Sequence, residues 1–86
     1  MHTFPEIAAR LKRAQGHLAA VIEMLEARRP CLDLAQQLHA VEKAIGNAKK
    51  ELIKDHINHC MEETSAARPR ELKELIKEFQ GFTKYL

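Results

Sequence analysis

Apolar side chains recur along most of this chain at alternating spacings of four and three residues. One run is formed by Ile7, Leu11, Ala14, Leu18, Val21 and Leu25, and a second by Leu34, Leu38, Val41, Ile45, Ala48 and Leu52. This spacing places an apolar stripe along one side of a helix and is typical of helices that pack lengthwise against others. No segment shows the period of two that a half-buried strand needs. The sequence therefore predicts an all-α protein.

Breaks in this pattern divide the chain into three predicted helices. Thr3 begins a capping-box pattern (TFPE) and is expected to cap the first helix. Pro30 is expected in the first turn of a second helix, which runs to about Glu63. A third, short helix follows Pro69, and Gly81 is expected to end or loosen it. Its apolar face is formed by Leu72, Leu75, Ile76 and Phe79.

Length and composition limit the class of protein further. The chain has 86 residues, which we interpret as a single domain (1–86) that is too short to bury a large core alone. We therefore expect a homo-oligomer. The chain is 45% hydrophobic and 30% charged, which excludes a disordered protein. It has no apolar run that could span a membrane and no apolar signal core, so we expect a cytoplasmic protein.

The segment DHINHC (55–60) contains the most distinctive polar residues. His56 and Cys60 lie four residues apart and share a helix face, so both can bind one atom. The other cysteine, Cys31, lies 25 residues before His56, which corresponds to roughly 37 Å of helix. In a continuous helix Cys31 cannot reach His56 of its own chain. It can reach His56 and Cys60 of a second, antiparallel copy, and a two-fold axis then gives two equivalent sites.

Two thiolates and one imidazole form a soft set of three ligands that suits Cu(I). Zn(II) usually needs a fourth ligand, for which the candidates are His2, His59 and Glu74. The alternative is structural, because cysteine is often a small buried apolar residue and a single histidine often packs. The sequence has no glycine-rich phosphate loop, and a Cys-His nucleophile would lack a pocket in so short a helical chain. We therefore do not expect an enzyme.

The net charge of +2 is too small to identify a partner. The basic residues nevertheless form two groups, Arg10, Lys12 and Arg13, and Lys49, Lys50 and Lys54. Such groups are often solvated helix faces, and contact with nucleic-acid phosphates is the functional alternative.

Three segments carry a resemblance to a known family. RLKRAQGHL (10–18), LAQQLHAVEKAI (34–45) after Cys31, and HINHC (56–60) resemble the CsoR/RcnR family of bacterial metal-sensing repressors over about residues 7–79. The resemblance implies an antiparallel helical dimer, usually paired again into a flat tetramer, that binds operator DNA without a helix-turn-helix. It also implies that ligand binding lowers the affinity for DNA, so that an efflux or detoxification gene is expressed.

The ligand positions distinguish the sensors of this family. Cys31, His56 and Cys60 match the Cu(I) sensors, and Glu74 is the expected match to a glutamate in their third helix. Ni(II) and Co(II) sensors have histidine in place of Cys60 and use an N-terminal histidine, for which His2 is the candidate. Persulfide sensors keep the two cysteines but lack the histidine. Formaldehyde sensors keep the first cysteine, usually with a proline at position two. We expect Cu(I), with Ni(II), Co(II), Zn(II) or persulfide as alternatives.

For DNA, the resemblance points to basic residues of the first helix and of the middle of the second. Arg10 aligns with the most typical of them, and the further candidates are Lys12, Arg13, Lys49 and Lys50. Such residues mostly contact phosphates, which makes the affinity depend on salt concentration. The expected partners are double-stranded operator DNA and further copies of the chain, as a homodimer or homotetramer. The alternative class is a metal-binding or oligomeric scaffold that does not bind DNA.

Overall fold

The computed structural model describes residues 4–64 and 68–86, which contain three α-helices and a final 3₁₀ turn. The helices are α1 (Phe4–Glu26), α2 (Cys31–Thr64) and α3 (Pro69–Phe82), and η1 (Thr83–Tyr85) follows. The side chains of Cys60, Glu63 and Thr64 lie outside the described part of the chain, as do the predicted cap Thr3 and His2. The prediction of an all-α fold of three helices is confirmed.

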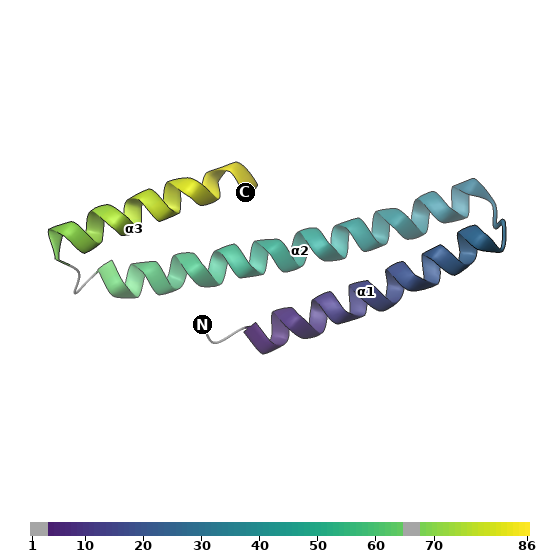
Figure 1. Ribbon diagram of the computed structural model, residues 1–86, viewed down its shortest axis with the longest axis horizontal. Coiled ribbons are helices and arrows are strands. Elements are labelled where there is room, and N and C mark those ends of the chain that lie inside the picture. The colour runs from purple at the N-terminus through teal and green to yellow at the C-terminus, as the bar shows by residue number, and fades with distance from the viewer. Residues whose placement is uncertain (1–3, 65–67) are drawn as a thin grey trace.

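The helices form an elongated antiparallel arrangement (Figure 1). α1 and α2 run side by side in opposite directions, and α3 turns back along the C-terminal half of α2. The dimensions are 58 × 24 × 13 Å, and the radius of gyration is 18.0 Å. A compact domain of this length would have a radius of gyration of about 12 Å. The monomer is therefore a long, thin hairpin with little interior.

A tight turn joins α1 to α2. Arg28 has a positive φ of 56°, and its N–H donates to the carbonyl of Leu25 at 3.1 Å. The N–H of Arg29 donates to the carbonyl of Met24, also at 3.1 Å. These two bonds form a Schellman motif, in which the left-handed residue ends the helix and satisfies its last carbonyl groups. The turn reverses the chain within four residues and sets α1 antiparallel to α2.

Two helix boundaries differ by one residue from the predictions. Pro30 precedes α2 instead of lying in its first turn, and its carbonyl accepts a hydrogen bond from the N–H of Leu34 at 3.1 Å. Gly81 lies inside α3, which continues through Phe82. A lone glycine weakens a helix by only about 1 kcal/mol, so the packing of α3 on α2 is sufficient to continue the helix past it.

The core occupies only half of each apolar stripe. Every seventh residue is buried where α1 meets α2, and these residues are Ile7, Ala14 and Val21 of α1 with Leu34, Val41 and Ala48 of α2. The alternate positions, four residues later, are 38–62% exposed, and these are Leu11, Leu18, Leu25, Leu38, Ile45 and Leu52. Because the helices are antiparallel, these alternate positions lie on the same side of the pair. We call these six residues the apolar face.

Candidate metal centre and nucleic-acid interface

His56 is held between α2 and α3. Its Nε2 lies 3.2 Å from Oε1 of Glu78, and its ring centroid lies 4.6 Å from that of Phe82. The His56 side chain is 15% exposed. A carboxylate only accepts hydrogen bonds, so this contact assigns the proton to Nε2 in the neutral ring and the lone pair to Nδ1. Metal-binding histidines are commonly oriented in this way, with one nitrogen on a carboxylate and the other on the metal.

Cys31 lies at the opposite end of the same helix. It is the first residue of α2, and its thiol is free and exposed. Helix α2 is continuous for 34 residues, so the 25 residues from Cys31 to His56 span roughly 37 Å. Among the described residues of one chain, no group of three possible metal ligands is brought together. Cys60 lies on α2 one turn after His56, but its side chain is outside the described part.

The third-helix glutamate in contact with His56 is Glu78, and the match of Glu74 to the glutamate of the Cu(I) sensors stays a prediction. Glu74 instead lines a shallow groove on α3 with Arg70 and Lys77. Glu78 was not predicted from the sequence, although its spacing from the apolar residues of the third helix indicated its position. Glu78 lies three residues after Leu75 and four before Phe82, which are two of the three half-buried residues of α3. This spacing places Glu78 beside the face that packs on α2. Of the other candidate ligands, His59 is partly buried and His2 lies outside the described residues.

The structure brings only some of the predicted DNA-binding residues together. Arg10 and Arg13 line one groove between α1 and α2. Lys50 lines a different groove of about 200 Å³, beside Ile53 and Ile57. Lys12 and Lys49 are exposed on α1 and α2.

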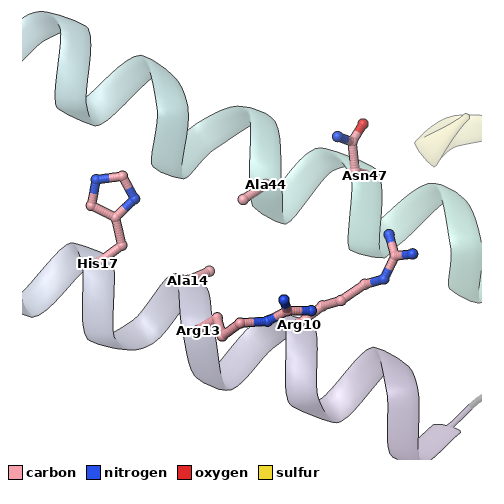
Figure 2. Close-up of a pocket in the computed structure, with 6 residues that line it drawn as sticks. All are labelled: Arg10, Arg13, Ala14, His17, Ala44 and Asn47. Carbon is pink, nitrogen blue, oxygen red and sulfur yellow. The ribbon is translucent and has the colours of Figure 1, made fainter.

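The groove between α1 and α2 has a volume of about 310 Å³ (Figure 2). We call it the basic groove, and its lining residues are Arg10, Arg13, Ala14, His17, Ala44 and Asn47. At its side, Nε2 of His17 lies 2.7 Å from Oε1 of Gln37, which links α1 to α2. Arg10 lies three residues after Ile7 and four before Ala14, and Arg13 lies directly before Ala14. Both arginines are therefore on the side opposite the apolar face. The helix pair therefore has an apolar face on one side and the basic groove on the other.

Among the described helices, none is both long enough and apolar enough to cross a lipid bilayer.

Comparison with known proteins gives a consistent result. The sequence profile of one family, described as metal-sensitive transcriptional repressor, matches residues 4–80. The copper-sensing transcriptional repressor CsoR of Bacillus subtilis is 35% identical over 81 residues, which is 92% of this chain and 80% of that protein. No solved structure matches the chain significantly.

Mycobacterial relatives match over shorter segments. CsoR of Mycobacterium ulcerans is 39% identical over 51 residues, which is 59% of this chain and 44% of that protein. The copper-sensing repressor RicR of Mycobacterium tuberculosis is 32% identical over 54 residues, which is 63% of this chain and 56% of that protein. The chain thus spans about half of these mycobacterial relatives.

Proposed function

We propose that this chain, which belongs to the family of metal-sensitive transcriptional repressors, binds operator DNA. It is released from the DNA when Cu(I) binds between two subunits. The family is one of transcriptional repressors, so the expectation that the chain is not an enzyme is confirmed. As a repressor, it would act in the cytoplasm, where it would control genes for metal efflux or detoxification.

The observation that carries the proposal is the separation of the ligands along α2. Cys31 and His56 belong to one rigid helix and lie roughly 37 Å apart, so one metal ion cannot bind both in the same chain. Two antiparallel copies of α2 place Cys31 of one chain beside His56 and Cys60 of the other. A two-fold axis then repeats the site at the other end of the dimer.

The uncovered surface of the monomer supports such a dimer. The chain exposes 7079 Å², whereas a compact monomer of 9.8 kDa exposes about 5,200 Å². The difference of about 1,900 Å² exceeds the roughly 800 Å² that each partner loses in an interface of standard size. The apolar face is the part of this excess that most favours burial, so we place the second copy there. The remaining excess of exposed surface is sufficient for two dimers to pair as a tetramer.

The donor set suits Cu(I). Two thiolates and an imidazole are soft ligands, and three of them satisfy Cu(I), whereas Zn(II) would need a fourth. The contact of Nε2 with Glu78 orients the lone pair on Nδ1 of His56 for a bond to metal. The three relatives described above are named copper sensors, which favours Cu(I) over Ni(II) or Co(II).

We assign operator binding to Arg10, Lys12, Arg13, Lys49 and Lys50. These residues would neutralise DNA phosphates, so the affinity should fall steeply as salt concentration rises. Metal affinity and DNA affinity must be reciprocally coupled. Any factor by which Cu(I) weakens DNA binding is the same factor by which DNA weakens Cu(I) binding. The His56–Glu78 contact connects the metal site to α3 and is the element through which we propose this coupling acts.

The test is an anaerobic titration followed by fluorescence anisotropy. The protein is bound to a labelled duplex of its own upstream promoter region and titrated separately with Cu(I) and with a persulfide donor. We expect release at about one Cu(I) per subunit, loss of that release in Cys31→Ala, and no response to persulfide. The matched control is His39→Asn, an exposed histidine of α2 outside the site. Release by persulfide alone would overturn the assignment of the inducer.

A further inference from the structure

One aromatic side chain of α3, that of Phe82, lies against the imidazole ring of His56. The two ring centroids are 4.6 Å apart, and the ring planes are inclined at 45°. This separation is within the range in which aromatic rings attract one another. Phe82 is the last residue of α3 and is half-buried. The imidazole is therefore in contact with an apolar ring as well as with the carboxylate of Glu78 at Nε2.

The residues of α2 that lie one turn before His56 are also apolar. Ile53 is only 3% exposed, and Leu52 belongs to the apolar face. Residues three and four positions apart are neighbours on a helix surface, so both of these side chains lie beside His56. We call Leu52, Ile53 and Phe82 the apolar wall. Beside this wall, the side chain of His56 is 15% exposed.

The ligand set alone does not exclude Zn(II), because thiolates and imidazoles are also the usual ligands of zinc. The two ions differ in the number of ligands they need. Three soft ligands satisfy Cu(I), whereas Zn(II) takes a fourth, which is often a water molecule. An apolar surface next to a metal ligand limits the access of water, and a water molecule needs polar partners to be held in place. An apolar wall therefore disfavours an ion that has to recruit water.

We propose that Phe82 is a positioning residue that makes the metal site selective for Cu(I) over Zn(II). Its ring holds the imidazole of His56 in one orientation and keeps water away from that side of the ring. This proposal rests on the proposed Cu(I)-sensing function and deepens it. The ligands remain Cys31, His56 and Cys60, and the selectivity is assigned to a side chain that binds no metal.

The experiment compares two substitutions of similar size in the reduced, full-length protein. Phe82→Leu keeps the wall apolar, whereas Phe82→Gln introduces a carboxamide that can hold a water molecule. Phe79→Gln is the matched control, because it replaces the same residue type on the same helix at a position that is 39% exposed. Circular dichroism shows that each variant has kept its helices.

The first measurement is made without metal, by NMR of the imidazole C–H groups. The ring current of Phe82 shifts the His56 signals, so both Phe82 variants should move these signals. Phe79→Gln should leave them close to their wild-type positions. Unchanged His56 signals in both Phe82 variants would show that the two rings do not pack together in solution, and would overturn the proposal.

The second measurement is the affinity for Cu(I) and for Zn(II), each determined by competition with a chelator. We expect Phe82→Gln to lower the ratio of Cu(I) affinity to Zn(II) affinity about 10- to 100-fold. Phe82→Leu should keep most of the wild-type ratio, because leucine still excludes water. Co(II) serves as a spectroscopic probe, and in Phe82→Gln it should show the intense visible bands of a four-coordinate site.

The outcomes distinguish the possible failures. If the wild-type protein does not bind Cu(I), the proposed function fails and the selectivity fails with it. If the wild-type protein binds Cu(I) but Phe82→Leu and Phe82→Gln lower the affinity ratio equally, only the exclusion of water by Phe82 is overturned. An unchanged ratio in Phe82→Gln, or an equal loss in Phe79→Gln, would also overturn the selectivity while leaving the Cu(I) site itself intact.

Discussion

At the scale of single residues, His56 is the side chain whose surroundings say most about the proposed metal site. Its contacts with Glu78 and Phe82 hold the ring before any ligand arrives. A ring that is already oriented loses little rotamer freedom on binding metal, which favours affinity. The same contacts mean that a change at the ring is transmitted directly to α3. Binding and signalling are therefore expected to depend on Glu78 as well as on the ligands.

Glu78→Gln is predicted to keep the fold and DNA binding but to weaken Cu(I) binding about 10- to 100-fold. The amide still fits the space but no longer offers a carboxylate to Nε2. Competition with a colorimetric Cu(I) chelator measures the affinity. Glu74→Gln is the matched control and should leave the affinity unchanged. Equal losses in the two variants would contradict the role of the His56–Glu78 contact.

Arg28→Gly is predicted to stabilise the protein by about 1 kcal/mol. Arg28 has a positive φ, which costs a residue with a Cβ about 1–2 kcal/mol and costs glycine almost nothing. Urea unfolding at fixed protein concentration measures the change in free energy. Arg29→Gly is the control, because Arg29 has no positive φ and should lose stability or remain unchanged.

At the scale of secondary-structure elements, the apolar spacing was sufficient to predict the helices. It did not predict which residues of each apolar stripe are buried between α1 and α2 and which stay exposed. The four-three pattern predicted α1 and α2 because both positions of each stripe must be buried somewhere. It could not say that Ile7 and Val21 would meet α2 while Leu18 stayed exposed, since both positions are equally apolar. Glu78 was missed for a related reason. Its spacing from Leu75 and Phe82 places it beside the face of α3 that packs on α2, but its contact with His56 depends on how the two helices are rotated. The separation of Cys31 from His56 was predictable because it depends only on the continuity of α2.

Gly46→Ala is predicted to stabilise α2 by about 0.5–1 kcal/mol. Gly46 lies inside the helix, where glycine is less favourable than alanine, and a Cβ there meets no atom within 4 Å. Urea unfolding measures the effect, and Gly81→Ala in α3 is the comparison, because a Cβ there also meets nothing within 4 Å. A loss of stability at Gly46 alone would indicate that another copy of the chain packs closely against this position.

At the scale of the whole molecule, the monomer has two sides with different properties. The residues of its apolar face remain 38–62% exposed, while its basic groove lies on the opposite side. A dimer that buries the apolar face leaves the basic grooves of both subunits outward, where DNA can reach them. The same arrangement brings the two ends of α2 from different chains together. We therefore expect assembly, metal binding and DNA binding to depend on one another, because all three depend on this one dimer arrangement.

Leu18→Glu is predicted to convert the protein to a monomer or an unfolded chain. It places a charge in the centre of the apolar face, where burying an unpaired carboxylate costs several kcal/mol. Sedimentation velocity measures the assembly state, and circular dichroism shows whether the helices persist. Ala20→Glu, an exposed position of α1 outside the apolar face, is the control and should assemble normally. An unchanged oligomer in Leu18→Glu would contradict the placement of the second copy.

Complementation tests most directly whether each metal site is shared between two chains. Cys31→Ala and Cys60→Ala proteins are each predicted to bind Cu(I) weakly when alone. After the two are mixed and exchanged, a mixed dimer contains one intact site, in which Cys31 comes from one chain and His56 with Cys60 from the other. Random exchange in equal amounts makes half of the dimers mixed, so about a quarter of the wild-type sites should return. Cu(I) titration against a chelator measures this fraction. Recovery of about a quarter of the tight sites is the predicted result, and no recovery despite demonstrated subunit exchange would contradict a shared site.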